Sequence, residues 1–450
     1  MSGASRKALL ALSTAVCLFF SFQLLFFHAL HQPYFVDEML VTQSSFNFFT
    51  HGNYTFSFWR LDNRWFAPGV SVGIASSWAS YFGWILGRSL LWARMASVLY
   101  CFALFMVAAV LAARRLGIRD KWMAVAFGSL AWLALFRLVP YSFESALYSL
   151  GELSGGIILA IGFMLLEKHP RAGSVLLGIC VWHTKMIYLP FALVGMFALY
   201  PARGLRGVGR CLLWFMLPQA AWLVMVWIMT GWKGLGFWIS YRLFFIHKRG
   251  NAGLDRVPEV SGFFERLARL EWSGYIPGRK YRLLLLVVLP QLLLLWLVIK
   301  EYLAVGRRLA GSMIFKAGML ACMAVFSAWY FFWHPFMWIR HIEPALLAGF
   351  GVIAWYFASV VLRLRGFFKK AVYGGVLALA LSFALAAGLL TKTPEEMVFL
   401  GAAYPRQDYS RSCRHEQPWK TGPRDTLACD TVTMVECKGH DDECAPESWQ

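Results

Sequence analysis

The chain has 450 residues, of which 59% are hydrophobic and 15% are charged. An ordinary soluble domain carries about 25% charged residues, so a water-soluble fold of this composition would expose more apolar surface than soluble monomers do. The formal net charge is +19, but the basic residues are scattered in short loops, which argues against a nucleic-acid partner. We therefore expect a protein that spans a membrane many times and keeps its basic loops on the cytoplasmic side.

Apolar segments long enough to be transmembrane helices follow one another from the N-terminus. A helix needs about 20 apolar residues to cross the roughly 30 Å hydrocarbon core of a bilayer. Basic residues at the inner ends of these segments place the N-terminus in the cytoplasm and the C-terminus outside. The largest outward loops between spans are then residues 31–88 and 230–280. We predict eleven spans, at residues 8–30, 89–112, 121–138, 150–166, 172–184, 187–200, 211–229, 281–299, 312–332, 342–362 and 371–391.

The stretch 172–200 allows two threadings through the membrane. One long span would turn the basic loop 203–210 outward, against the positive-inside rule. Two short helices with a break near Lys185 and Met186 restore the rule, and such breaks are tolerated where protein or a water-filled cavity covers the backbone. We therefore predict a break at Lys185, an ionisable residue at membrane depth that is a functional candidate by default. The alternative is a lysine that extends to the outer interface.

The first outward loop begins with two adjacent carboxylates, Asp37 and Glu38. Residues 37–50 mix polar and aromatic positions, which predicts an interfacial helix, and residues 70–86 predict a second one. The two acids are explained equally well as residues at a helix N-terminus, favoured by the helix dipole, as a general base for a hydroxyl nucleophile, or as ligands of a divalent cation. Glu152, at the start of a span, is interpreted as an ordinary helix-N-terminal acid.

The C-terminal tail differs in composition from the rest of the chain. It is polar and contains Cys413, Cys429, Cys437 and Cys444, which predicts two disulfides of open connectivity in an oxidising compartment. A zinc site is the rival interpretation, but no closely spaced Cys-x-x-Cys pair is present. We divide the chain into a transmembrane domain, residues 1–391, and an extracytoplasmic tail, residues 392–450.

Three stretches carry a resemblance to a known family. The first is VDEMLVTQSSFNFFTHGNY, followed by RWFAPGV from Arg64, Tyr81-Phe82-Gly83 and Ala93-Arg94. The second is SVLLGICVWHTKMIYLP, from Ser174 to Pro190, and the third is FSAWYFFWHPFMWIRHIEPALLAG, from Phe326 to Gly349. Together they resemble the membrane glycosyltransferases of the GT-C class that use polyprenyl-phosphate sugars, including the protein O-mannosyltransferases and the lipid A aminoarabinose transferases. Two departures stand out, because Ala67-Pro68 replaces a Pro-Pro pair and His341 stands where a tyrosine is usual.

The resemblance covers most of residues 8–360 and implies an all-α, GT-C-like membrane enzyme. It implies that Asp37 is the base that deprotonates an acceptor hydroxyl, with Glu38 in a secondary role. The donor is then a sugar on a polyprenyl phosphate, and the acceptor is a glycan, lipid or protein on the outer face of a bacterial inner membrane. Cations near the leaving phosphate lower the barrier, and the candidates are Lys185, Arg340, Arg64 and Arg60. Candidate substrate-binding residues are Glu144, His341, Tyr241 and Arg242.

Several alternatives stay open at this point. The basic and aromatic loop 230–280 fits a phosphorylated substrate, but a helix resting on anionic lipid headgroups explains it equally well. A divalent cation held by Asp37 and Glu38 is the one cofactor that the sequence leaves open. The alternative function is a non-enzymatic membrane protein, either a lipid-linked-sugar transporter or an envelope assembly partner. A transporter would place ionisable residues along a path through the centres of the spans.

Overall fold

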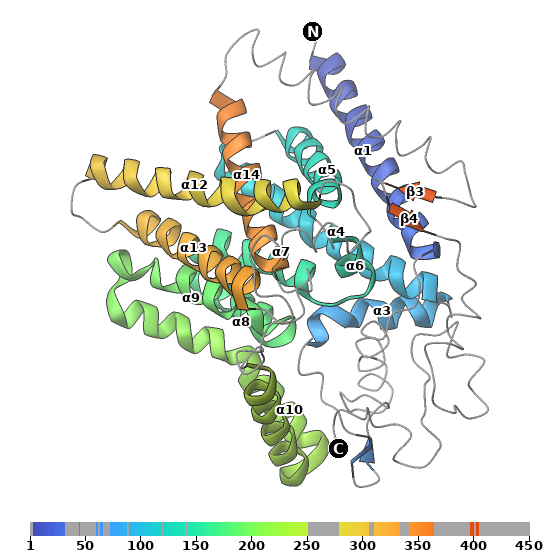
Figure 1. Ribbon diagram of the computed structural model, residues 1–450, viewed down its shortest axis with the longest axis vertical. Helices are drawn as coiled ribbons and strands as arrows, with labels where there is room; N and C mark the ends of the chain where they lie inside the picture. The colour runs from blue at the N-terminus through green and yellow to red at the C-terminus, as the bar shows by residue number, and fades with distance from the viewer. Residues whose placement is uncertain are drawn as a thin grey trace.

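Apolar helices make up almost all of the structure, a computed structural model of the chain (Figure 1). It describes residues 3–31, 45, 60–61, 64–65, 73–87, 90–118, 120–139, 142–250, 279–305, 310–333, 342–363, 397–399 and 402–404. Its helices are α1 (Gly3–His31), α3 (Ile74–Gly87), α4 (Leu90–Arg115), α5 (Lys121–Leu138), α6 (Ser142–Leu147), α7 (Glu152–Leu166), α8 (Pro170–His183), η1 (Met186–Tyr188), α9 (Leu189–Phe197), α10 (Tyr200–Gly250), α12 (Arg279–Val305), α13 (Gly311–Ala328), η2 (Trp329–Trp333) and α14 (Glu343–Arg363). Two short antiparallel pairs join β1 (Arg60–Leu61) to β2 (Arg64–Trp65) and β3 (Met397–Phe399) to β4 (Ala402–Tyr404).

Long apolar helices confirm the membrane class that composition predicts. Helices long and apolar enough to cross a bilayer cover Leu91–Arg115, Tyr200–Ile228, Leu285–Ala304, Gly311–Phe332 and Glu343–Val361, and shorter apolar helices cover Leu10–Phe26, Lys121–Phe136, Glu152–Leu166 and Met186–Phe197. Each predicted span up to residue 362 falls on a helix. The predicted span 371–391 lies outside the described residues, so the total of eleven spans stays a prediction.

The two helices predicted in the first outward loop have different outcomes. The second, predicted over residues 70–86, is α3. The first, predicted over residues 37–50, lies outside the described residues except for Ser45, whose hydroxyl hydrogen-bonds to that of Ser77 in α3. This contact ties one point of the first loop to α3.

Local sequence rules explain several helix boundaries and bends. Asp120 caps α5, because its carboxylate accepts hydrogen bonds from the backbone of Trp122 at 3.0 Å and of Met123 at 3.4 Å. α10 is bent at Gly204 and Gly231, where φ is 62° and 68°, a left-handed conformation that glycine adopts at little cost. Beyond Gly231 the helix continues to Gly250, into residues predicted as an outward loop (Figure 1).

Helix α7 lies near the centre of the bundle (Figure 1), and ten of its fifteen residues are buried. Leu153 and Ile157 join a cluster around the fully buried Trp132, which α1, α4, α5 and α14 share. Ile158 and Leu159 join a second cluster, built from α8, α9, α10, α12 and α13. A helix buried all round is the pattern expected for the middle of a bundle. The N-terminus of α7 is therefore enclosed by helices that are distant in the sequence.

Candidate functional site

The candidate site begins at the break in the chain between α8 and α9. α8 ends at His183, and Lys185 has an extended backbone, with φ −149° and ψ 123°. The chain then turns through η1 and re-enters a helix at Leu189. The backbone N–H of Lys185 donates to the carbonyl of Cys180 at 3.0 Å, so the break is held by hydrogen bonds. The predicted break at Lys185 and Met186 is confirmed.

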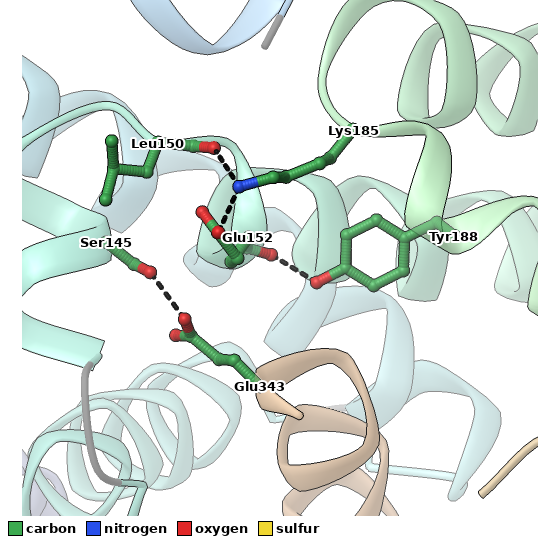
Figure 2. Close-up of polar contacts among 6 residues, drawn as sticks. All are labelled: Ser145, Leu150, Glu152, Lys185, Tyr188 and Glu343. Carbon is green, nitrogen blue, oxygen red and sulfur yellow. Dashed lines mark hydrogen bonds and ion pairs between the residues drawn. The ribbon is translucent and has the colours of Figure 1, made fainter. Parts of the chain in front are cut away.

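The side chain of Lys185 points to the first residue of α7 (Figure 2). Its ammonium forms an ion pair with Glu152 Oε1 and donates to the carbonyl oxygen of Leu150 at 3.2 Å. The Lys185 side chain is 16% exposed and that of Glu152 is fully buried. Tyr188, also in the break, donates its hydroxyl hydrogen to the backbone carbonyl of Glu152. These contacts favour a functional or structural ion pair over a lysine that reaches outward to lipid headgroups.

The turn between α6 and α7, residues 148–151, contains the Leu150 carbonyl that accepts from Lys185. Hydrogen bonds among serine hydroxyls hold this turn in place. Ser149 and Gly151 both have positive φ, at 56° and 88°. Ser149 Oγ lies 2.6 Å from Ser80 Oγ of α3 and donates to Ser97 Oγ of α4 at 2.8 Å. Ser97 in turn donates to the carbonyl of Ala146 at 2.6 Å. A positive φ in a non-glycine residue such as Ser149 costs about 1 kcal/mol or more. Such a conformation persists only where surrounding contacts stabilise it.

A second buried carboxylate approaches from the start of α14. Glu343 is fully buried, and its Oε2 accepts a hydrogen bond from Ser145 Oγ of α6 at 2.7 Å (Figure 2). Glu152 and Glu343 are close enough to repel each other electrostatically, and the charge of Glu144 adds to the repulsion on Glu343. Within the described part of the chain, Glu152 Oε2 and Glu343 Oε1 have no hydrogen-bond partner. Glu152 is thus paired with the ammonium of Lys185, whereas the carboxyl of Glu343 accepts from a neutral hydroxyl.

The residue that precedes α3 packs against the helix break between α8 and α9. Gly73 donates its backbone N–H to the carbonyl of Thr184 at 2.9 Å. A Cβ atom on Gly73 would lie 2.3 Å from the carbonyl carbon of His183, so only glycine fits this approach. The residue next to Lys185 is thereby fixed to the helix that ends the first outward loop.

Of the predicted site residues, the structure brings Lys185 and Glu144 to this region. Arg60 and Arg64 lie in the β1–β2 pair, and Tyr241 and Arg242 lie in the second part of α10, but for these four residues the structure describes only the backbone. The remaining predicted residues lie outside the described part of the chain: Asp37, Glu38, Arg340, His341, Cys413, Cys429, Cys437 and Cys444. Their roles stay predictions.

The sequence interpretation of Glu152 as an ordinary helix-N-terminal acid needs correction, because its carboxylate is buried and pairs with Lys185. Glu343 was not predicted at all. The signal that identifies both acids is the cost of an ionisable side chain at the start of an apolar span. Their common location depends on tertiary packing, since Glu152 and Lys185 are 33 residues apart and Glu343 comes from a helix near the end of the described chain.

The described side chains contain no group of three or more His, Cys, Asp or Glu residues that could hold a metal ion. Asp37 and Glu38, the predicted ligands of a divalent cation, lie outside the described residues.

Comparisons with known proteins identify the fold. No protein-family model matches the chain, and no curated protein matches it in sequence. A similar solved structure is the crystal structure of ArnT from Cupriavidus metallidurans bound to undecaprenyl phosphate, with a TM-score of 0.50 and 16% sequence identity. The match covers 86% of this chain and 66% of that chain. The chain therefore has a helical fold similar to that of ArnT, and it spans about two thirds of that neighbour's length.

Proposed function

We propose that the chain is an inverting glycosyltransferase that moves a sugar from a polyprenyl-phosphate donor to an acceptor hydroxyl on the outer face of the membrane. The observation that carries the proposal is a lysine held at a helix break inside an ArnT-like fold. The neighbour in that fold binds undecaprenyl phosphate. A single ammonium at membrane depth suits the phosphate of a lipid whose tail stays in the bilayer, because burial strengthens its interaction with an anion.

The proposed reaction forms one bond and breaks one. The acceptor oxygen attacks the anomeric carbon while Asp37 takes the hydroxyl proton. The bond from the anomeric carbon to the phosphate oxygen breaks on the opposite face, and the electron pair leaves with the lipid phosphate. Glu38 orients Asp37 or the acceptor, or holds a divalent cation with it. Attack opposite to the leaving group inverts the configuration of the anomeric carbon.

Charge developing on the leaving phosphate calls for fixed cations. In the proposal Lys185 supplies one, and Arg340, Arg64 and Arg60 supply the others from loops on the same side. Glu144, His341, Tyr241 and Arg242 bind the sugar or the acceptor. The sugar and acceptor are defined here only as classes, a lipid-phosphate-linked hexose or pentose and a hydroxyl of a glycan, lipid or protein.

The distribution of buried charge supports a one-sided active site over a transport path. Among the described residues, the fully buried charged side chains are Arg94, Glu152 and Glu343. Arg94 is near the start of α4, and the two acids open α7 and α14. In the predicted threading, all three of these positions lie at outward helix ends. A transporter would instead need ionisable side chains at successive depths.

The test uses the purified full chain in lipid nanodiscs with a panel of polyprenyl-phosphate sugars. We expect wild type to release free polyprenyl phosphate from one donor in the panel, and Asp37→Asn to do so at least about 100-fold more slowly, as expected for loss of a general base. The anomeric configuration of the transferred sugar, read by NMR, should be inverted. Release that survives Asp37→Asn unchanged would refute the base assignment, and retention of configuration would refute the single displacement.

A further inference from the structure

Lys185 carries a counter-ion that opposes the binding of an anion. Glu152 pairs with its ammonium inside the protein and is itself fully buried. With Glu152 ionised, this ion pair carries no net charge. A phosphate approaching Lys185 therefore meets attraction from the ammonium and repulsion from the Glu152 carboxylate, both weakly screened by the surrounding protein.

The geometry leaves room for a third partner on Lys185. An ammonium has three N–H donors, and two of them are used, by Leu150 at 3.2 Å and by Glu152. Glu152 is fully enclosed, whereas the Lys185 side chain keeps 16% of its surface exposed. A ligand can thus reach Lys185 while Glu152 stays behind it. Glu152 therefore holds Lys185 in place and also repels any anion that binds to Lys185.

The charge of the lipid phosphate changes during the proposed reaction. A polyprenyl-phosphate sugar is a phosphodiester with one negative charge, whereas the released phosphomonoester carries about −1.5 to −2 at neutral pH. The extra charge on the product increases its repulsion from Glu152. This acid thus disfavours the product more strongly than the donor.

We propose that Glu152 is a positioning residue that holds Lys185 at the helix break and weakens retention of the doubly charged lipid phosphate relative to the singly charged donor. This inference rests on the proposed function, because it requires the lipid phosphate to bind at Lys185. It assigns to Glu152 a role in release of the leaving lipid. A lysine without this acid would bind the product more tightly than the donor.

The experiment measures equilibrium binding of two lipids with the same tail to the full chain in nanodiscs. One is undecaprenyl phosphate, a monoester, and the other is its methyl phosphodiester. We expect Glu152→Gln, whose amide oxygen can still accept from Lys185, to bind the monoester about tenfold more tightly, a gain of about 1.4 kcal/mol. The diester should gain less. Glu152→Asp keeps the charge and should keep the wild-type ratio of the two affinities.

A second acid–lysine pair provides a matched control. Glu301 of α12 pairs with Lys316 of α13, away from the break, so Glu301→Gln removes the same charge elsewhere and should change neither affinity. Where Glu152→Gln does not yield folded protein, Glu152→Met removes the same charge with an apolar side chain of similar length. It should also tighten monoester binding more than diester binding.

The outcomes separate this inference from the proposed function. Lys185→Gln should weaken binding of both lipids about tenfold or more, as loss of a charged hydrogen bond predicts. If it does so while Glu152→Gln leaves the ratio of affinities unchanged, or reduces both affinities equally, the acid has only a structural role and the inference is wrong. If Lys185→Gln changes neither affinity, the lipid phosphate does not bind at Lys185 and the proposed function loses its main support.

Discussion

The close approach of Gly73 to the helix break makes Gly73→Ala a sensitive test of how the candidate site is built. The added Cβ would lie 2.3 Å from His183 C, 2.4 Å from its Cα and 2.5 Å from its O. Ordinary carbon contacts need about 3.5–4.0 Å. These are backbone atoms, so no rotamer change relieves the overlap, and α3 and the break must separate by about 1 Å.

Two costs follow from this separation. Forcing an extra carbon into packed structure costs about 1–3 kcal/mol. The separation also weakens the hydrogen bond of 2.9 Å from the Gly73 N–H to the Thr184 carbonyl, which is worth about 0.5–1.5 kcal/mol. Together, the free energy of unfolding should fall by about 2–4 kcal/mol. Because Thr184 precedes Lys185, the movement also displaces the lysine, and a misplacement of about 1 Å can cost roughly 100-fold in rate.

The assay combines denaturant unfolding in mixed micelles with binding of undecaprenyl phosphate. The control is Gly351→Ala in α14, where an added Cβ meets no heavy atom within 4 Å. This control should be neutral or stabilising by up to about 1 kcal/mol, since alanine favours helix over glycine. If Gly73→Ala unfolds and binds lipid as wild type does, the clamp between α3 and the break does not position Lys185, and the description of the site is wrong.

Three further predictions follow from other contacts. Lys185→Met should destabilise the protein by about 3–5 kcal/mol, because it leaves Glu152 buried without its partner. Adding Glu152→Met should recover most of that loss in denaturant unfolding. Additive losses would show that the two side chains are not coupled. Arg115→Gln should change the unfolding free energy by less than about 1 kcal/mol, because its partner Glu167 is 70% exposed, and a larger loss would contradict the surface assignment. The cysteine of Arg206→Cys should react with an impermeant maleimide from the cytoplasmic side only. Labelling from outside would show that the loop 203–210 faces outward and would contradict the predicted threading.

The helices were largely predictable because the thickness of the bilayer sets the length of a spanning helix, and apolar runs of that length are visible in the sequence. An apolar run bounded by charges predicted residues 121–138, the range of α5. The break at Lys185 followed from counting basic residues in loops, a rule about membrane sidedness. Both inferences use neighbouring residues in the chain, which is why one sequence sufficed.

The partners within the site were not predictable in the same way. Nothing local links Lys185 to Glu152, and the approach of Glu343 depends on how α14 packs beside α7. The sequence around Gly73 does not indicate its close approach to the backbone of His183, because tertiary packing creates that contact. The helical residues after Gly231 agree with the helix that the sequence left open in the loop 230–280, and Gly231 itself marks a bend.

The central claim is that the lysine at the helix break meets the phosphate of a lipid-linked sugar during its transfer. It is tested most directly by the rate at which free polyprenyl phosphate is released from the accepted donor by wild type, Lys185→Gln and Lys316→Gln in nanodiscs. Lys316 is the matched lysine, since it also pairs with an acid, Glu301. We predict that Lys316→Gln keeps the wild-type rate and that Lys185→Gln loses at least about 100-fold, the loss typical of removing one stabilising donor. Equal rates for Lys185→Gln and wild type would contradict the claim.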